Sequence, residues 1–425
     1  MLAELMKRKR LVSTGLAIVL LAAGLALWGC ADHPTEYNDP AATIVTTKTP
    51  TALIEAATLA EWIDEGRLNS TDPDSRDKVV ILTVSTAAAY ATGHIEGSQL
   101  WNYDTEVFQT RLEGVAAMSS MVPTGPVLDA LLCRFGIDEH TTVVFTTSTT
   151  GSARDLREAT RGWWTLRYWG FPKDRIKVLQ GGDVGWTTAG FTLVTDVPTI
   201  TPSVFSVREL AATSSFGADY RASIGEIIRA VDGINSGALT DVKMLDTRGG
   251  VDPVAGGKLM PAALDTWNGY YVVGTSGTLK PLDELVARLA TFGVTESTPL
   301  TYVNCQGGVK CTVVFFVLDG MLGWPVQSYD GSWGQWSGYS NASIAAAWKV
   351  AGTSPAGDTP GTTIQRSFGT WTAGSPAIDP VANSAFGIAD PRANQIENED
   401  AAYFSSGGTT TPPAGGGGGG GGSGC

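Results

Sequence analysis

Strand-length apolar runs alternate with helix-length segments along most of this chain. Residues 78–84 (Lys-Val-Val-Ile-Leu-Thr-Val) and 141–145 (Thr-Thr-Val-Val-Phe) are β-rich, and a helix-length segment follows each. Residues 300–303 form a similar run before an apolar, helix-length stretch at 312–322. Continuous apolar strands separated by helices are typical of a parallel sheet covered by helices on both faces. The pattern predicts an α/β fold.

The second half of the chain repeats the first. Phe-Gly-Ile-Asp-Glu at 135–139 matches Phe-Gly-Val-Thr-Glu at 292–296, and an amphipathic helical pattern precedes each. When the match is continued without gaps, Ser148 falls on Cys305. Further matches pair 81–85 with 244–248, 170–172 with 323–325, and 179–186 with 329–336. A repeat of this length indicates two copies of one domain.

The two copies differ in chemistry at three matched positions. The second copy has a cysteine, an aspartate and an arginine there, whereas the first has a serine, a threonine and a serine. The pairs are Cys305 with Ser148, Asp246 with Thr83, and Arg248 with Ser85. A reactive site is therefore expected in the second copy.

Residues 305–311 (Cys-Gln-Gly-Gly-Val-Lys-Cys) join a predicted strand to a predicted helix. The two glycines let the chain curl tightly, so that successive N–H groups point inward and can bind an anion. The start of a helix adds partial positive charge. Both effects favour the thiolate of Cys305, which is the nucleophilic form. The other interpretation is a small buried apolar residue at the end of a strand.

Four short motifs follow one another along the chain. They are Tyr-x-x-Gly-His-Ile-x-Gly at 90–97, Leu-x-Gly-Gly-x-x-x-Trp at 179–186, a strand ending Asp-x-Arg at 244–248, and Tyr-Asp-Gly-Ser-Trp at 329–333. Their order and spacing resemble the tandem-domain rhodanese family, which includes thiosulfate and 3-mercaptopyruvate sulfurtransferases. The resemblance covers about residues 53–341.

The resemblance implies two tandem rhodanese-like domains, each a parallel sheet flanked by helices. An inactive domain is expected at 51–196 and a catalytic domain at 205–345. In that family, a cysteine in a six-residue loop of the second domain forms a persulfide, and Cys305 matches it. The residues expected to bind substrate are Gln306, Gly307, Gly308, Val309, Lys310, Asp246 and Arg248.

Two departures from the family pattern leave the substrate open. Thiosulfate-preferring members often carry Arg and Lys where this chain has Gln306 and Gly307. Residues 257–261 read Gly-Lys-Leu-Met-Pro where Gly-His-Ile-Pro is expected. Lys310 and Arg248 are then the cations left to hold an anionic donor.

The leading hypothesis is an enzyme that moves a sulfane sulfur through a persulfide on Cys305. The donor would be thiosulfate, mercaptopyruvate or polysulfide, and the acceptor a thiol or cyanide. The alternative is a non-catalytic rhodanese-fold subunit that binds a partner, or carries sulfur or selenium, within a cell-surface complex. A phosphatase of the Cys-x₅-Arg type is disfavoured, because Cys311 stands where the phosphate-binding arginine would be.

Cys311 admits three roles. It lies six residues from Cys305, so a disulfide between them is conceivable. It could also act as a resolving thiol for the persulfide. The third interpretation is a small residue that packs under the loop.

The chain has distinctive ends. Residues 7–10 are basic, an apolar run follows at 11–28, and Gly29 precedes Cys30, which is the pattern of a lipoprotein signal peptide at 1–29. Cys30 would be lipidated, with residues 30–50 as a tether and the protein held in the cell envelope, at the outer membrane. The alternative is an uncleaved transmembrane anchor.

The tail at 351–425 is rich in Gly, Pro and Thr and predicts flexible chain. Residues 364–371 and 400–404 are its candidates for docked segments.

Composition limits the ligands. The chain has 42 acidic and 29 basic residues, a net charge of −13, which argues against a nucleic-acid partner. It has 3 histidines and no Cys-x-x-Cys pair, so neither a metal site nor a c-type haem is expected. No nucleotide-binding motif occurs, and no cofactor is expected. The expected partners are a small sulfur donor and a thiol acceptor.

Overall fold

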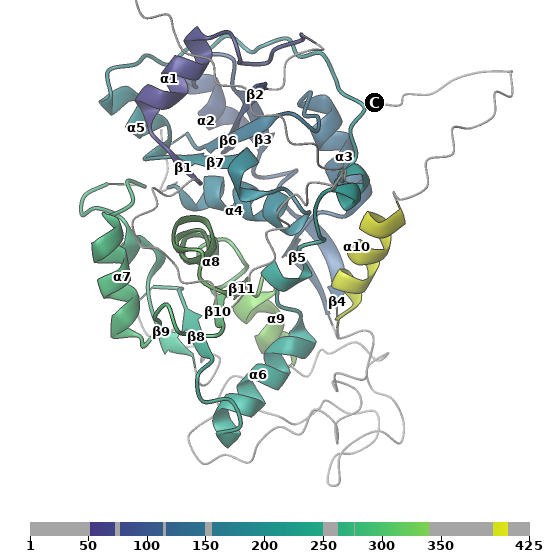
Figure 1. Cartoon of the computed structure of the whole chain (residues 1–425), viewed down its shortest axis with the longest axis vertical. Coiled ribbons are helices and arrows are strands. Elements are labelled where there is room, and N and C mark those ends of the chain that lie inside the picture. The colour runs from purple at the N-terminus through teal and green to yellow at the C-terminus, as the bar shows by residue number, and fades with distance from the viewer. Residues whose placement is uncertain are drawn as a thin grey trace, which may run out of the picture. The chain divides into compact units, whose positions relative to one another are not determined.

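Two parallel sheets form the framework of the protein. The computed structural model describes residues 52–72, 77–113, 116–148, 155–249, 262–275, 277–339 and 394–406. The first sheet has five strands in the order β1-β7-β6-β2-β3, and the second has four in the order β11-β10-β8-β9. Every pair of neighbouring strands in these two sheets is parallel. The predicted α/β class is confirmed, and Figure 1 shows the helices around the strands.

The strands of the first sheet are β1 Leu53–Ile54, β2 Val79–Ser85, β3 Gln99–Asn102, β6 Thr142–Thr146 and β7 Ile176–Leu179. Those of the second are β8 Lys243–Asp246, β9 Ala263–Leu264, β10 Thr301–Asn304 and β11 Val326–Ser328. A separate antiparallel hairpin is formed by β4 Gln109–Glu113 and β5 Ala116–Met121. The sequence pattern did not predict this hairpin.

The helices before the second sheet are α1 Ala56–Asp64, α2 Ala87–Thr92, α3 Gly125–Arg134, α4 Arg157–Tyr168, α5 Gly182–Thr188 and α6 Ile224–Ser236. The later ones are α7 Leu282–Thr291, α8 Cys311–Phe315, the π-helix η5 Phe316–Leu322, α9 Ser332–Tyr339 and α10 Gln395–Ser405. Short 3₁₀ helices are η1 Lys173–Arg175, η2 Val207–Ala212, η3 Ala218–Tyr220 and η4 Trp267–Tyr270.

Helix α4 joins the two halves of the molecule. It is almost wholly buried, because it packs on the first sheet and also against α8. The Thr160 and Thr312 hydroxyls are 2.9 Å apart, and Trp163 meets Phe316 edge-to-face with ring centroids 5.0 Å apart. A Cβ on Gly162 would lie 2.8 Å from the ring of Phe145, so the glycine permits this close approach. A single apolar core therefore includes residues of both halves.

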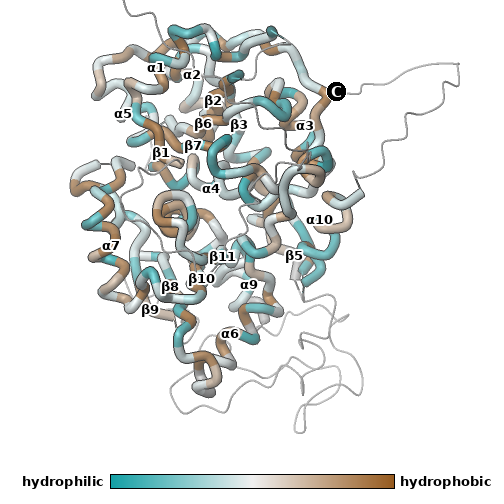
Figure 2. Tube along the Cα trace, in the orientation of Figure 1, coloured by the Kyte–Doolittle hydropathy of each residue, from teal (hydrophilic) through white to brown (hydrophobic). Residues whose placement is uncertain are grey.

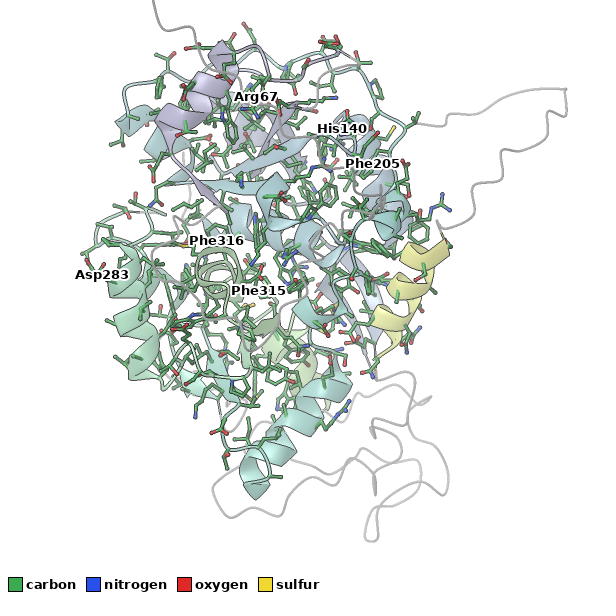
Figure 3. The ribbon with its side chains drawn as sticks, viewed as in Figure 1. Arg67, His140, Phe205, Asp283, Phe315 and Phe316 are labelled. Atoms are coloured by element: carbon green, nitrogen blue, oxygen red, sulfur yellow. The ribbon has the colours of Figure 1, made fainter. Side chains whose placement is uncertain are left out.

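The segment after Cys305 is helical, as predicted, but not uniformly α-helical. It begins at Cys311 as α8 and continues as the π-helix η5 from Phe316, ending at Gly323 with a φ of 71°. Figure 2 shows the apolar character of this segment, and Figure 3 labels Phe315 and Phe316 on it. All five residues of α8 are buried, which explains the continuous apolar pattern.

Part of the tail is ordered. Residues 395–405 form α10, so the expectation of flexible chain is wrong there, while the docked segment expected at 400–404 lies within this helix. The other expected segment, 364–371, is outside the described residues, as are the apolar run at 11–28 and Cys30. None of the described helices is long and apolar enough to span a membrane. The predicted domain boundaries stay predictions.

Candidate active site

Cys305 lies directly after β10, at the carboxyl edge of the second sheet. Its neighbour Asn304 pairs with Asp246 of β8, which brings the two predicted site segments together. The Cys305 side chain is buried, and its thiol is free. Residues 305–310, here called the catalytic loop, curl between β10 and α8.

The carbonyl groups of the catalytic loop are bound on its outer side. The amides of Trp333 and Gly334, at the start of α9, donate to the carbonyls of Cys305 and Gln306 at 3.0 and 2.9 Å. The Thr312 hydroxyl donates to the carbonyl of Val309 at 2.7 Å. With these carbonyls bound outward, the amides of Gly307 and Val309 are left to face the sulfur.

Three amides and one thiol donate to the Cys305 sulfur. They are the N–H groups of Gly307, Val309 and Cys311, here called the amide cradle, and the thiol of Cys311. Burial raises the pKa of Cys305, but these hydrogen bonds outweigh burial and lower the pKa to about 5. Cys305 is therefore a thiolate at neutral pH, and this matches the interpretation of the loop as an anion-binding turn.

Gly308 allows the catalytic loop to curl. Its φ is +72°, which disfavours residues with a side chain, and a Cβ there would lie 2.5 Å from the carbonyl oxygen of Asp330. Its amide donates to the Ser332 hydroxyl at 3.0 Å, and the amide of Cys305 donates to the same oxygen at 3.1 Å. Ser332 in turn donates to the carbonyl of Tyr329 at 2.7 Å. The Ser332 hydroxyl thus holds the backbone of the loop at two residues, Cys305 and Gly308. The motif that contains Ser332 did not reveal this role.

Cys311 lies beneath the loop and is not disulfide-bonded to Cys305. Burial and the neighbouring Cys305 thiolate raise the pKa of Cys311 well above the usual value for a thiol. Its sulfur is also 3.5 Å from the Ser328 hydroxyl. Cys311 is therefore a protonated donor to Cys305 in this structure, and its role as a resolving thiol stays a prediction.

Asp246 and Arg248, both expected to bind substrate, form an ion pair with each other. Nε of Arg248 donates to both Asp246 oxygens at 2.9 and 3.0 Å. The guanidinium also lies over the ring of Trp333, 4.6 Å from its centroid. Asp246 is fully buried, and Arg248 is partly exposed. The ion pair therefore holds the positive charge of Arg248 beside the indole ring of Trp333.

Lys310 is turned toward the edge of the site. Its ammonium lies 4.0 Å from the centroid of the Trp267 ring and donates to the carbonyl of Arg248 at 3.4 Å. Partial burial lowers the pKa of Lys310, and the Cys305 thiolate opposes that shift. Lys310 is thus close enough to interact electrostatically with the sulfur. Gln306 is exposed beside it.

The first half of the chain also contributes to the site, through residues that the sequence did not single out. Arg161 of α4 is fully buried and donates to the carbonyl of Gly308 at 2.7 Å and to that of Ser120 at 3.1 Å. A Cβ on Gly307 would lie 3.2 Å from the Ser120 hydroxyl, so the β4–β5 hairpin reaches the catalytic loop. No sequence signal singles out Arg161, because α4 also carries Arg157, Glu158 and Arg167.

The matched site of the first half carries no thiol. Ser148, at the position of Cys305, is buried and donates to the carbonyl of Ala89 at 3.3 Å. Thr83, at the position of Asp246, bonds to Ser98. Cys133 is buried elsewhere and donates to the carbonyl of Ser203. Within the described residues, no three His, Cys, Asp or Glu side chains cluster as metal ligands. The segment 257–261 lies outside those residues.

Known proteins resemble the chain in sequence, although no family model matches it. The sulfur carrier protein TtuD of Thermus thermophilus is 27% identical over 316 residues, covering 68% of this chain and 96% of that protein. A putative thiosulfate sulfurtransferase of Haloferax volcanii is 24% identical, covering 67% and 94%. The 3-mercaptopyruvate sulfurtransferase of Escherichia coli O157:H7 is 26% identical, covering 67% and 95%.

Solved structures share the fold. SseA of Escherichia coli, a rhodanese-fold protein, superposes with a TM-score of 0.52 at 22% identity, covering 66% of this chain and 98% of SseA. An anaerobic ergothioneine biosynthesis enzyme of Chlorobium limicola superposes with a TM-score of 0.51 at 19% identity, covering 69% of each chain.

A cysteine in a tight loop after the central strand of a parallel α/β domain, with a second such domain beside it, defines a class: the rhodanese-fold sulfurtransferases. The chain is similar to tandem-domain rhodanese proteins in sequence and in fold, and its relatives named as sulfurtransferases support sulfurtransferase activity.

Proposed function

We propose that the chain transfers sulfane sulfur through a persulfide on Cys305. The observation that carries this proposal is the set of donors around the sulfur, which lowers the pKa of the Cys305 thiol to about 5 inside a buried site. A thiolate at neutral pH is the form that attacks sulfur, and the same N–H groups would stabilise the terminal sulfur of a persulfide anion. The amide cradle therefore serves both states of the cysteine.

The transfer needs two displacement steps and no oxidant. In the first, the Cys305 thiolate attacks the sulfane sulfur of the donor, a sulfur–sulfur bond forms, and the rest of the donor departs with the electron pair of the broken bond. With thiosulfate the leaving group is sulfite. In the second, an acceptor thiolate or cyanide attacks the outer sulfur and Cys305 leaves as a thiolate. In each step one anion attacks and another anion departs, so the total charge does not change.

An anionic donor fits the surroundings of Cys305. Lys310 and Arg248 both present positive charge close to the catalytic loop, and Trp267 and Trp333 hold their side chains in place. Two relatives are named as thiosulfate or 3-mercaptopyruvate sulfurtransferases, whose donors are anions. We assign thiosulfate, mercaptopyruvate and polysulfide as donors to be compared, with a thiol or cyanide as acceptor.

The test is to incubate the purified protein with each donor and measure the mass of the intact chain. The wild type should gain one sulfur atom on Cys305, located by peptide mapping, and pass it to cyanide or a dithiol. Cys305→Ser should abolish both the adduct and the transfer, because serine cannot form a persulfide. Cys133→Ser is the matched control and should keep both.

Two results would contradict the proposal. An adduct that persists in Cys305→Ser would place the sulfur elsewhere, including the first domain, where Cys133 is the thiol among the described residues. An adduct that no acceptor removes would favour the alternative of a non-catalytic sulfur-handling subunit.

We further propose that the enzyme works in the cell envelope, held by a lipid on Cys30. The support is the sequence pattern at 1–30 alone, a basic segment, an apolar run and a cysteine after Gly29. Donor and acceptor would then meet the enzyme at a membrane surface. An envelope protein complex is a further candidate partner.

A further inference from the structure

Helix α10 buries a charged face. Ile396, Asp400 and Phe404 follow one another at intervals of four residues and are all buried, so they form one stripe of the helix. Glu399, on another face, is exposed. An acid in the middle of a buried stripe is costly unless it is paired, so its partners show what the helix is built to hold.

Asp400 ties α10 to the β4–β5 hairpin. Both of its oxygens accept from Arg111 of β4, at 2.7 and 2.8 Å, and one accepts from the Tyr168 hydroxyl at 2.9 Å. The side chains of Arg111 and Asp400 are only 4% and 3% exposed. This two-bond geometry is the strong form of an arginine–carboxylate pair. Through this ion pair, α10 holds the β4–β5 hairpin, which contacts the catalytic loop.

Glu397, one helical turn earlier, contacts a second arginine. One of its oxygens is 3.2 Å from Arg221, which is fully buried and also bonds Asp330 at 2.9 Å and Glu113 at 2.8 Å. Arg221 follows η3, whereas Glu113 is the last residue of β4. Arg221 therefore links Glu397 of α10 to Glu113 of the hairpin and to Asp330.

Asp330 carries this connection to the catalytic loop. Its second oxygen accepts from the Val122 amide at 3.0 Å and lies 3.9 Å from Arg161. Its backbone lies directly against Gly308, close enough to exclude a Cβ. Gly308 stands between two residues of the amide cradle, Gly307 and Val309. A shift of Asp330 would therefore move the groups that face the sulfur.

We propose that α10 is a positioning element of the sulfur-transfer site, acting through Asp400 on the β4–β5 hairpin and through Glu397 and Arg221 on Asp330. This inference rests on the proposed function. Glu397 and Asp400 touch no reacting atom; they are positioning residues. The helix belongs to the tail and includes residues 400–404, which the sequence marked as a candidate docked segment.

The test uses the full-length enzyme with Asp400→Asn and, separately, Glu397→Ala. Asp400→Asn keeps the shape of the side chain but removes the buried anion of Arg111, which keeps only the exposed Glu399 at 3.3 Å. Glu397→Ala removes one contact of Arg221. Asn398→Ala, at an exposed position on the same helix, is the matched control. Activity is measured well below the melting temperature and expressed per titrated Cys305 thiol, so that unfolded enzyme does not count.

Each positioning variant should lower kcat by about tenfold or more, since small misplacements of reacting groups cost that much, while the KM for the donor changes little. The pH at which the Cys305 thiol ionises should rise in the same variants, and Asn398→Ala should match the wild type. If α10 only stabilises the fold, the variants would have a lower melting temperature but an unchanged kcat and an unchanged pH of thiol ionisation. That result would overturn the inference. If Asp400→Asn does not fold, Glu397→Ala decides by the same criteria. A wild type that forms no persulfide would instead refute the proposed function.

Discussion

The reactivity of Cys305 comes from backbone groups more than from charged side chains. The amide cradle and the Cys311 thiol surround its sulfur, whereas Lys310 points to Trp267 and Arg248 pairs with Asp246. Neutral residues at positions 306 and 307 are therefore compatible with an ionised cysteine. The cations are left to act on the donor.

The first prediction concerns pH. Because the pKa of Cys305 is about 5, the thiolate is fully formed above roughly pH 6. The rate of persulfide formation should be flat from there to neutral pH and should fall about tenfold per pH unit below the pKa. Rapid-mixing kinetics with an excess of donor measure this profile.

Cys311→Ala supplies the control, since it removes one donor to the thiolate. The midpoint of the pH profile should move upward in that variant. A wild-type midpoint near that of an ordinary thiol would show that the amide cradle does not stabilise the anion.

The second prediction compares two adjacent glycines. Gly308→Ala should lower the free energy of unfolding by about 2 kcal/mol and sulfur transfer by at least about tenfold, because φ is +72° and the new methyl would meet the Asp330 backbone. Gly307→Ala should be nearly neutral in stability, since its methyl would meet only the Ser120 hydroxyl at 3.2 Å. Denaturant unfolding and steady-state assays of both variants decide it, and equal losses would contradict the assignment.

At this scale the sequence singled out Cys305 as the candidate nucleophile but not the residues that support its loop. Cys305 was visible because strand, glycines and helix are adjacent in the chain. Arg161 and Asp330 lie far from Cys305 in sequence, and no short pattern marks the tertiary contact that brings them to Gly308. Ser332 lies within the Tyr-Asp-Gly-Ser-Trp motif, but the motif alone does not show that its hydroxyl accepts from the Gly308 amide. That contact depends on how α9 packs against the loop.

At the scale of elements, α4 and α8 are the pair that brings the two halves to one site. Their contact places Arg161 next to the catalytic loop, and the burial that this requires lowers the pKa of Arg161. The alternation of apolar runs predicted these helices. It could not predict that α8 continues as a π-helix from Phe316, because no local pattern marks that change.

The third prediction concerns this arginine. Arg161→Lys keeps the positive charge, but a single ammonium lacks the fork that reaches the carbonyls of Gly308 and Ser120 together. We expect a loss of about 1–3 kcal/mol in the free energy of unfolding and a lower kcat, because a buried carbonyl loses its donor. Arg134→Lys, an exposed pair with Glu106, is the control and should change neither quantity. Unchanged kcat in Arg161→Lys would show that the fork does not position the loop.

At the scale of the whole molecule, the repeat was the most informative sequence feature. It predicted two parallel sheets, and both are present. The hairpin β4–β5 and the docking of α10 could not be predicted from it, since neither has a counterpart that the repeat would reveal. The hairpin contacts the catalytic loop, and α10 in turn holds the hairpin.

The fourth prediction concerns location. If Cys30 is lipidated, the mature chain begins at Cys30 and partitions into detergent, because each buried methylene of an acyl chain contributes about 0.8 kcal/mol. Cys30→Ala should block that processing and leave sulfur transfer intact. Mass spectrometry of the N-terminus of protein from its host measures it; an unmodified N-terminus at another residue would rule the lipid anchor out.

The position of α10 has a consequence for biosynthesis. A chain is made from its N-terminus, and its domains fold in that order. Cys305 emerges about 90 residues before the helix that fixes Arg221 and the hairpin. On the proposed role of α10, the Cys305 thiol reaches its low pKa only after that helix has docked, so the order of synthesis delays the ionisation of the thiol until the later segment folds.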